Sequence, residues 1–99
     1  MELEWDDAKR QANLVKHGID FRDLGPLFTV PDRIEFEDQR YGYGERRLVL
    51  LGTLRGRLLL VTYTPRGEKC RIISARKANH RERRFHERIR NDRQGDRDS

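Results

Sequence analysis

The sequence predicts an α+β domain with two N-terminal helices, a four-stranded and mainly antiparallel meander sheet, and a C-terminal helix. Three observations support this prediction. Helix-type spacing of apolar residues occurs near the N-terminus, apolar runs separated by tight turns fill the middle, and an arginine-rich helical stretch ends the chain. Short turns between consecutive strands favour antiparallel pairing.

The first helix is expected over residues 5–18, with both ends marked. Asp6 can cap the N-terminus by accepting a backbone N–H, and Gly18 suits the left-handed residue that follows a helix. Lys16 and His17 add positive charge to the last turn, which favours the helix dipole. A narrow apolar stripe at helical spacing is formed by Ala8, Ala12 and Val15.

A shorter and weaker second helix is expected over residues 21–28, interrupted by a Gly-Pro pair at 25–26 and stopped before Pro31. Residues 34–36 alternate between apolar and polar, which predicts a short edge strand. Residues 38–44 have the composition of a flexible loop.

Three closely spaced strands follow, over residues 46–53, 57–64 and 69–75. Turn residues separate them, Arg-Gly at 55–56 and Pro-Arg-Gly at 65–67. The continuous apolar runs in the first two strands predict that both are central and covered on at least part of both faces.

The third of these strands carries two arginines. Because side chains alternate between the two faces of a sheet, we expect Arg71 and Arg76 on opposite faces. Arg76 would share its face with Ile72 and Ser74, and Arg71 would share its face with Ala75.

The terminal helix begins with a capping-box pattern, in which Asn79 is the N-cap and Glu82 follows three residues later. Its thin apolar seam consists of Ala78, Phe85 and Ile89. From residue 91 the chain is polar, so we expect a single domain over residues 1–90 and a frayed tail over residues 91–99.

Charge is unevenly distributed along the chain. Residues 66–99 contain 12 Lys and Arg against 6 Asp and Glu, whereas residues 1–65 contain 10 against 11. This asymmetry predicts a polyanion or an acidic protein as partner of the C-terminal third. With 34% hydrophobic and 39% charged residues, the core is lean, which favours association with a partner.

Several classes of protein do not fit the sequence. No apolar run exceeds four residues and the N-terminus has no signal-peptide pattern, so a cytoplasmic protein is expected. A single cysteine, Cys70, allows no intrachain disulfide. The three histidines and this cysteine lack zinc-site spacing, no glycine-rich phosphate loop is present, and Ser74 has no convincing His and Asp set, so neither a cofactor nor a metal is predicted.

The arginines are the candidate functional residues. An arginine near the apolar middle of a sheet needs a phosphate or carboxylate partner. For Arg71, an ion pair with a carboxylate such as Glu45 is a serious alternative to a functional role. For Arg76, where the strand leaves the sheet toward a basic helix, phosphate binding is slightly favoured, and Arg57 could line a substrate groove.

Two groups could move protons. Glu45 lies beside arginines at the start of a strand, where it could act as a base or form an ion pair, and the ion pair is the more common outcome. His86 on the terminal helix could hold a proton near neutral pH, although a surface histidine is more common. The remaining basic helix residues fit either a solvated face or contact with a nucleic-acid backbone; they are Arg81, Arg83, Arg84, Arg88 and Arg90.

Taken together, these segments resemble the BrnT family of type II toxin–antitoxin toxins. Over residues 2–87 the matching residues occur in order. They are Glu4-Trp5-Asp6, Lys9, Asn13, Lys16-His17-Gly18-Ile19, Phe21, Phe28, Pro31-Asp32, Gly44-Glu45, Arg47, Leu51-Gly52, Gly56-Arg57, Tyr63-Thr64, Arg71-Ile72-Ile73-Ser74-Ala75-Arg76 and Glu82-Arg83. Lys-His-Gly alone would be a weak signal, and the Arg-Ile-Ile-Ser-Ala-Arg segment makes the resemblance specific.

The resemblance implies a RelE-like fold and a ribonuclease that arrests translation and is neutralised by a BrnA-type antitoxin. It also implies that the complex binds its promoter DNA mainly through the antitoxin. RelE-like nucleases work without metal, with basic side chains supporting attack of the 2′-hydroxyl on the adjacent phosphate. The products would be a 2′,3′-cyclic phosphate and a 5′-hydroxyl.

On this resemblance, Arg76 and Arg71 would bind the scissile phosphate with help from Arg57, and Glu45 or His86 would move protons. Relatives often have Tyr where this chain has His86, which leaves the leaving-group acid unassigned. The RNA-binding residues would be Lys16, His17, Arg47, Lys77, Arg81, Arg83 and Arg84.

Two other functions fit the same residues. The chain could be a non-catalytic, basic nucleic-acid-binding subunit of a toxin–antitoxin repressor complex. It could also be a decayed toxin that is retained for antitoxin binding. Growth arrest on expression separates the enzyme from both alternatives.

Overall fold

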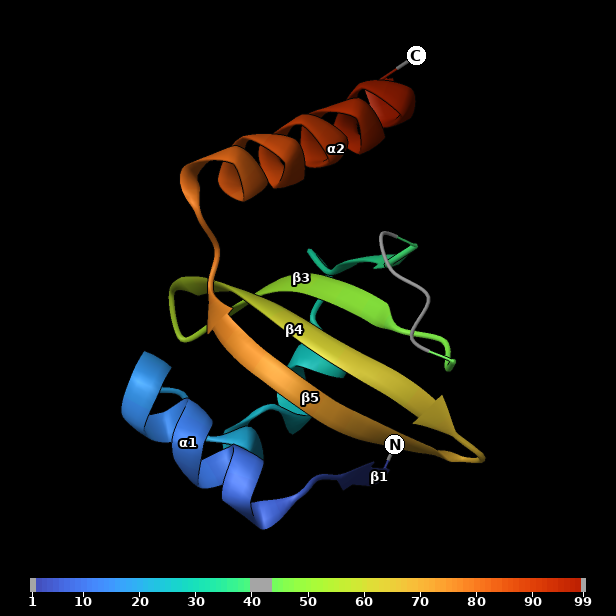
Figure 1. Ribbon diagram of the computed structural model, residues 1–99. Coiled ribbons are helices and arrows are strands. Elements are labelled where there is room, and N and C mark those ends of the chain that lie inside the picture. The colour runs from blue at the N-terminus through green and yellow to red at the C-terminus, as the bar shows by residue number, and fades with distance from the viewer. Residues whose placement is uncertain (1, 40–43, 99) are drawn as a thin grey trace.

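The structure, a computed structural model, describes residues 2–39 and 44–98, with side-chain environments up to residue 93 (Figure 1). Five strands, two α-helices and two 3₁₀ turns make up the described chain. In chain order they are β1 (Glu2–Glu4), α1 (Asp7–His17), η1 (Phe21–Asp23), η2 (Gly25–Phe28), β2 (Ile34–Glu37), β3 (Leu48–Leu54), β4 (Arg57–Arg66), β5 (Lys69–Lys77) and α2 (His80–Asp98).

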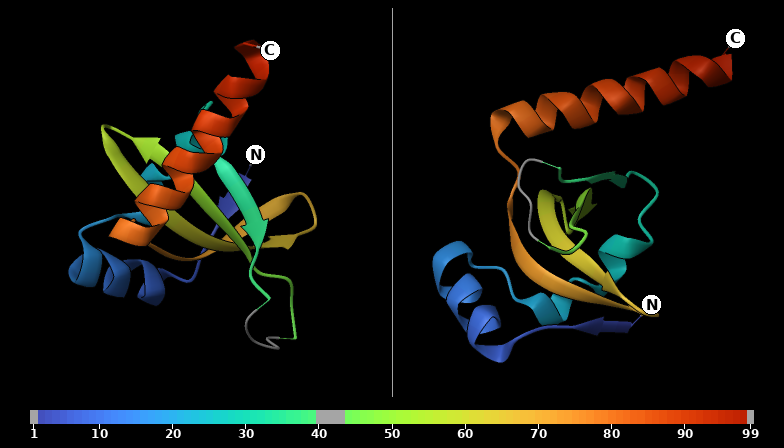
Figure 2. Two further views of the ribbon diagram at one scale, coloured as in Figure 1. Left: turned by 90° about the horizontal axis from the view of Figure 1, so that it is seen from above. Right: turned by 45° about the vertical axis from the view of Figure 1, so that its right-hand side comes forward.

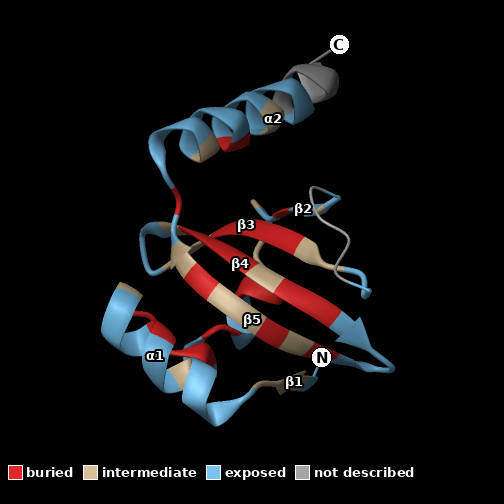
Figure 3. Ribbon diagram, viewed as in Figure 1, coloured by how far each residue is buried: buried red, intermediate tan, exposed pale blue. Residues whose placement is uncertain are grey.

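The strands form one sheet in the order β1-β5-β4-β3-β2. β1 pairs parallel with β5, and the other neighbours are antiparallel. α1 and the 3₁₀ turns cover one side of the sheet, and α2 crosses the other side (Figures 1 and 2). Figure 3 shows that β3, β4 and β5 carry most of the buried residues, whereas α2 is largely exposed.

The predicted fold class is wrong in two respects. The sheet has five strands rather than four, because residues 2–4 form β1, which is too short to show any periodicity in the sequence. Only one N-terminal α-helix is present, because residues 21–28 form two 3₁₀ turns. The strands β3 to β5 and the C-terminal helix lie where they were expected.

The 3₁₀ turns have a physical reason. Phe21, Leu24 and Leu27 are spaced by three residues, and all three are completely buried. A 3₁₀ helix has three residues per turn, so this spacing places all three side chains on one side. Pro26 has no N–H to continue an α-helical ladder.

Helix α1 begins and ends as predicted, but its expected apolar stripe is exposed. Asp6 accepts a hydrogen bond from the Lys9 backbone at 3.1 Å, and Gly18 has a φ of 71°. Val15, by contrast, is 89% exposed, and Ala8 and Ala12 also face solvent. The buried residue of this helix is Asn13, so α1 docks through a polar side chain.

The side-chain amide of Asn13 binds the backbone of β5. Its Nδ2 donates to the carbonyl oxygens of Ala75 (2.9 Å) and Ile19 (3.0 Å), and its Oδ1 accepts from the Ala75 N–H at 3.1 Å. Strand β1 pairs with residues 69–71 only. Asn13 therefore satisfies the outer edge of β5 where β1 no longer reaches it.

The larger core lies between the sheet and the N-terminal segments. It includes the buried side chains of Phe21, Leu24, Leu27, Phe28, Leu50, Leu59, Val61, Tyr63, Ile72 and Ala75. A smaller core under α2 consists of Ile34, Val49, Leu51, Leu60 and Ala78, with Leu58 and Ile89 packed against it. The side of the sheet that faces α2 is therefore the less completely filled one.

Helix α2 is assigned through Asp98, so helical backbone continues through residues that were expected to form a tail. The boundary at residue 90 remains a prediction. Residues 40–43 of the expected 38–44 loop lie outside the described residues. In the described parts of the chain, neither helix is both long and apolar enough to cross a membrane.

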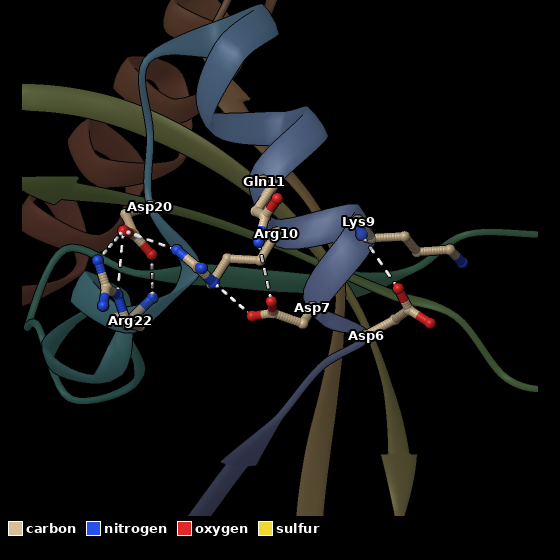
Figure 4. Close-up of polar contacts among 7 residues, drawn as sticks. All are labelled: Asp6, Asp7, Lys9, Arg10, Gln11, Asp20 and Arg22. Atoms are coloured by element: carbon tan, nitrogen blue, oxygen red, sulfur yellow. Dashed lines mark hydrogen bonds and ion pairs between the residues drawn. The ribbon is translucent and has the colours of Figure 1, made fainter.

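A polar network joins α1 to η1 (Figure 4). The carboxylate of Asp20 accepts hydrogen bonds from the backbone and guanidinium of Arg22 and from Arg10. Arg10 also binds Asp7 at 2.9 Å. The hydrogen bonds from Arg22 lower the pKa of Asp20 from its ordinary 3.8 to about 2, because they stabilise the ionised form.

We expect Asn13→Ala to destabilise the fold by about 3 kcal/mol, because three hydrogen bonds are lost and the buried backbone groups of Ala75 keep no partner. Urea unfolding measures this change. Asn13→Asp places a buried carboxylate oxygen against the carbonyl oxygens of Ile19 and Ala75, so we expect a loss at least as large. Equal stability of Asn13→Ala and wild type would contradict the docking role of this amide.

We expect the Asp20 carboxylate to stabilise the fold above pH 4 and to lose this contribution as the pH falls toward its folded pKa of about 2. The urea midpoint of wild type should therefore fall more between pH 5 and pH 2.5 than that of Asp20→Asn. Asp23→Asn, at an exposed position of the same turn, is the control and should follow wild type.

Candidate functional site

A β-bulge in β5 decides which side chains face α2. Thr62 pairs with Ser74, but Tyr63 pairs with Ile72, so Ile73 has no opposite residue. One extra residue reverses the alternation of faces beyond it.

The expected face assignment of the two arginines is therefore wrong. Arg71 lies opposite Thr64 and Arg76 lies opposite Leu60. Directly paired residues share a face, and residues 60 and 64 of β4 lie an even number apart, so Arg71 and Arg76 are on the same face. This face lies under α2, since Leu60 belongs to the smaller core. Ala75 and Ile72 together face the larger core instead.

Arg71 and Arg76 are nevertheless far apart. They are five positions apart on the strand, which corresponds to about 15 Å between their backbones. Arg71 lies toward the start of β5, opposite Glu4 of β1, whereas Arg76 lies near its end. This separation favours contacts with different parts of an extended ligand.

A hollow of about 410 Å³ opens around Arg76 on this face. We call it the Arg76 hollow. Its floor consists of Val49, Leu60, Thr62 and Ser74, and Arg76 and Glu82 form one side. The opposite side is formed by Phe36, Glu37, Asp38 and Gln39.

Arg76 forms a bidentate ion pair with Glu82. Nη1 and Nη2 of Arg76 each donate to one carboxylate oxygen of Glu82 at 2.8 Å. Glu82 also accepts from the Asn79 backbone, and Asn79 accepts from the Glu82 backbone, both at 2.8 Å, which confirms the predicted capping box. The guanidinium of Arg76 is therefore oriented by the first turn of α2.

A second hollow of about 650 Å³ lies between α2 and the β3–β4 turn. We call it the hairpin groove. Basic side chains dominate its α2 wall, where His80, Arg83, Arg84 and Arg90 lie with Glu87 as the acidic member. The other wall includes Thr53, Gly56 and Leu58. The surplus of positive charge suits a phosphate backbone.

His86 fastens α2 to the loop before β2. Its side chain is 7% exposed, and Nε2 donates to the Asp32 carbonyl oxygen at 2.8 Å and lies 3.3 Å from the Asp32 carboxylate. That carboxylate accepts from the hydroxyl of Thr53 at 2.6 Å. These contacts make a positioning role for His86 the simplest interpretation of its surroundings.

The other predicted residues lie in separate places. Lys16 and His17 end α1, on the opposite side of the sheet from α2. Arg57 is exposed at the β3–β4 turn. Glu45 is exposed, and its carboxylate lies 3.7 Å from the guanidinium of Arg47. It therefore forms an ion pair, the alternative to a role as a base that the sequence left open.

Lys77 and three arginines continue the basic surface beyond Arg76. Lys77 ends β5, and Arg81, Arg83 and Arg84 occupy the first turns of α2; all four are exposed. Of the sequence-predicted site residues, Arg76 is the one that lines the Arg76 hollow.

Sequence reasoning missed two residues of this hollow. Glu82 was assigned only a capping role, although the capping box already placed its carboxylate close to the end of β5. Phe36 was assigned only to an edge strand, and its exposed ring gave no periodic signal. Neither Cys70 nor Tyr63 fits a reactive role, because burial raises the pKa of both groups.

Comparison with protein families identifies the family of the chain. Residues 5–82 match the family model described as ribonuclease toxin, BrnT, of type II toxin–antitoxin system. The chain belongs to this family. No curated protein gives a significant match. Membership implies a ribonuclease toxin, with RNA as its substrate and a cognate antitoxin as its partner.

The family match contains Arg76 and Glu82 but ends within the first turn of α2. His86 and most of the arginine-rich helix therefore lie beyond the matched residues. Within the matched part, the Arg76 hollow is the place where an arginine, hydroxyl groups and an exposed aromatic ring come together.

We expect His86→Ala to loosen α2 by about 1–2 kcal/mol, because the contact with Asp32 is lost. Amide hydrogen exchange should become faster in residues 83–92, while β3, β4 and β5 stay protected. His80→Ala, at an exposed position of the same helix, is the control. Unchanged exchange in His86→Ala would contradict the fastening role.

Proposed function

We propose that this BrnT-family protein is a metal-independent endoribonuclease that arrests translation in the cytoplasm and is neutralised by a BrnA-like antitoxin. In this proposal, the complex with the antitoxin binds promoter DNA mainly through the antitoxin. The observation that carries the enzymatic proposal is the position of Arg76. It lies in a hollow on the sheet face under a basic helix, within the family match.

Arg76 would bind the scissile phosphate. A guanidinium has five N–H donors, and since Nη1 and Nη2 of Arg76 each donate to Glu82, a phosphate would bind further N–H groups of Arg76 or replace the carboxylate. Negative charge increases on these oxygens as the phosphate becomes five-coordinate, so an oriented cation lowers the barrier. The ion pair with Glu82 supplies the orientation.

In the proposed step, the 2′-oxygen of a nucleotide forms a bond to the adjacent phosphorus while the bond from phosphorus to the 5′-oxygen breaks. The 2′-hydroxyl proton passes to a base, and the departing 5′-oxygen takes up a proton. The products are a 2′,3′-cyclic phosphate and a 5′-hydroxyl. This step consumes neither water nor an oxidant.

The other basic residues would bind the rest of the RNA. Arg71, about 15 Å along the strand from Arg76, would contact a neighbouring phosphate rather than the scissile one. Lys77, Arg81, Arg83 and Arg84 would extend this contact along α2. Arg57, Arg47, Lys16 and His17 would be reached only by a longer RNA.

For proton transfer, Glu45 is the more accessible of the two candidates. It is exposed, whereas Nε2 of His86 is engaged with Asp32. A base must lie within hydrogen-bond reach of the 2′-hydroxyl, and Glu45 pairs with Arg47 outside the Arg76 hollow, so we leave the base of this step unassigned. We propose that His86 contributes to activity by positioning α2.

The bidentate ion pair raises a second possible role for Arg76, which is to hold α2 in place through Glu82. Glu82→Gln separates the two roles. Glutamine preserves the capping box, because it can fill the same position, but it removes the charge that Arg76 binds. The guanidinium of Arg76 remains present in this variant.

We expect expression of wild type to arrest growth and degrade RNA, and Arg76→Ala to lose both effects by at least about 100-fold, the magnitude of losing one oriented electrostatic group. Glu82→Gln should retain arrest and cleavage within about tenfold, because the glutamine oxygen can still accept a hydrogen bond that orients Arg76. Purified wild type should cleave RNA in EDTA. Antitoxin binding by each variant is the folding control.

Three outcomes would contradict this proposal. Equal loss in Arg76→Ala and Glu82→Gln would show that Arg76 acts through its ion pair. Activity that disappears in EDTA and returns with a divalent metal would contradict the mechanism. Soluble, antitoxin-binding wild type that neither arrests growth nor cleaves RNA would favour the nucleic-acid-binding subunit.

A further inference from the structure

Two exposed aromatic rings meet where α2 crosses β2. Phe36 of β2 is 41% exposed and Phe85 of α2 is 39% exposed. Their ring centres lie 5.9 Å apart at an angle of 77°, which is an edge-to-face contact. Such a contact covers one face of only one of the rings, so flat aromatic surface remains open to solvent.

Strand register places Phe36 opposite the arginine side of the Arg76 hollow. Phe36 pairs with Val49, Val49 with Thr62, and Thr62 with Ser74, so these four residues form one row across the sheet. Strand spacing of about 4.8 Å makes this row about 14 Å long. Arg76 ends the next row, two residues beyond Ser74 on the same strand.

The hollow has chemically different ends. At one end, the guanidinium of Arg76 is paired with the carboxylate of Glu82, while the other end has Phe36 with Asp38 and with Glu37, which pairs with Arg46. The floor between them is apolar at Val49 and Leu60 and carries hydroxyl groups at Thr62 and Ser74. A bound molecule that suits this hollow has an anionic group that binds Arg76 beside Glu82 or in its place, a flat apolar part and polar edges.

We propose that the Arg76 hollow binds one nucleotide of single-stranded RNA, with its base stacked on Phe36 and its phosphate toward Arg76. The acidic residues beside Phe36 repel a phosphate and can accept hydrogen bonds from amino groups of a base, which fixes this orientation. Aromatic side chains are common stacking partners for unpaired bases of RNA. This inference rests on the proposed ribonuclease function and assigns its base-binding subsite.

An antitoxin side chain is the other candidate for this hollow. The combination of a guanidinium, two hydroxyl groups and an open ring favours a nucleotide, because an apolar side chain would leave the polar groups of the floor without partners. We therefore treat antitoxin binding as an outcome of the test.

Binding of RNA with 2′-fluoro groups, which lacks the attacking hydroxyl, tests the subsite in the full-length protein. One set of oligonucleotides carries a single abasic position that moves along the strand. In wild type, one position should weaken binding about tenfold, the typical effect of losing one base–aromatic stack. Phe36→Leu should weaken binding of intact RNA about tenfold and remove the sensitivity to that abasic position.

Two further variants separate stacking from support of α2. Phe36→Trp keeps an aromatic surface and should retain the abasic sensitivity. Phe85→Leu removes the contact between the rings but leaves Phe36, so it should also retain the sensitivity. Thermal unfolding of each variant shows that the fold is intact.

The inference is overturned if Phe36→Leu keeps the full abasic sensitivity, or if Phe36→Leu weakens antitoxin binding but leaves RNA binding unchanged. Cleavage of unmodified RNA is measured in parallel. If wild type cleaves RNA and Phe36→Leu changes neither RNA binding nor the abasic sensitivity, only the subsite is overturned. Abasic sensitivity at Phe36 without any cleavage by wild type would overturn the proposed nuclease and leave the subsite supported.

Discussion

The hydrogen bonds between the side chain of Asn13 and the backbone of Ala75 hold the arrangement on which the rest of the structure depends. Residue 75 lies beyond the reach of β1 and two positions after the bulged residue of β5, Ile73. Without a partner there, the outer edge of β5 would leave buried backbone groups unsatisfied. Asn13 binds both groups of Ala75 and so attaches α1 to the segment that carries Arg76.

The two sides of the sheet are packed differently in this chain, which has few apolar residues. The side under α1 and the 3₁₀ turns has a continuous core that includes Phe21, Leu24 and Leu27. The side under α2 has a smaller core, and the helix is held mainly by individual contacts of Glu82, Phe85 and His86. The Arg76 hollow lies on this less filled side, with Glu82 of α2 forming part of its wall.

Arg76 illustrates the conflict between stability and function at such a site. Its ion pair with Glu82 neutralises charge and fixes the start of α2, which a purely structural role would also require. The same pair orients the guanidinium over an open hollow, which a phosphate-binding role requires. Both roles use the same geometry, so only a variant that separates charge from capping, such as Glu82→Gln, distinguishes them.

Local interactions could be predicted from the sequence. The caps of α1 at Asp6 and Gly18 and the capping box at Asn79 and Glu82 were correct, because each links residues only a few positions apart. The apolar runs likewise identified β3 and β4 as buried strands. Each of these patterns depends only on residues that are close together in the sequence.

Contacts between distant segments could not be predicted in this way. Strand β1 has only three residues and forms because β5 offers an edge. The apolar stripe of α1 faces solvent because Asn13 binds a residue 62 positions away. The face assignment of Arg76 was wrong because a bulge reverses side-chain alternation and leaves no pattern in the sequence.

The sequence by itself therefore determined the family resemblance, the basic C-terminal third, both ends of α1 and the start of α2. These properties depend on residue identity, on total charge or on hydrogen bonds between near neighbours. Only the tertiary structure decided that Arg71 and Arg76 share a face, that Glu82 holds Arg76, and that Phe36 completes the hollow. These facts depend on strand register and packing, which arise when distant segments compete for the same edges and surfaces.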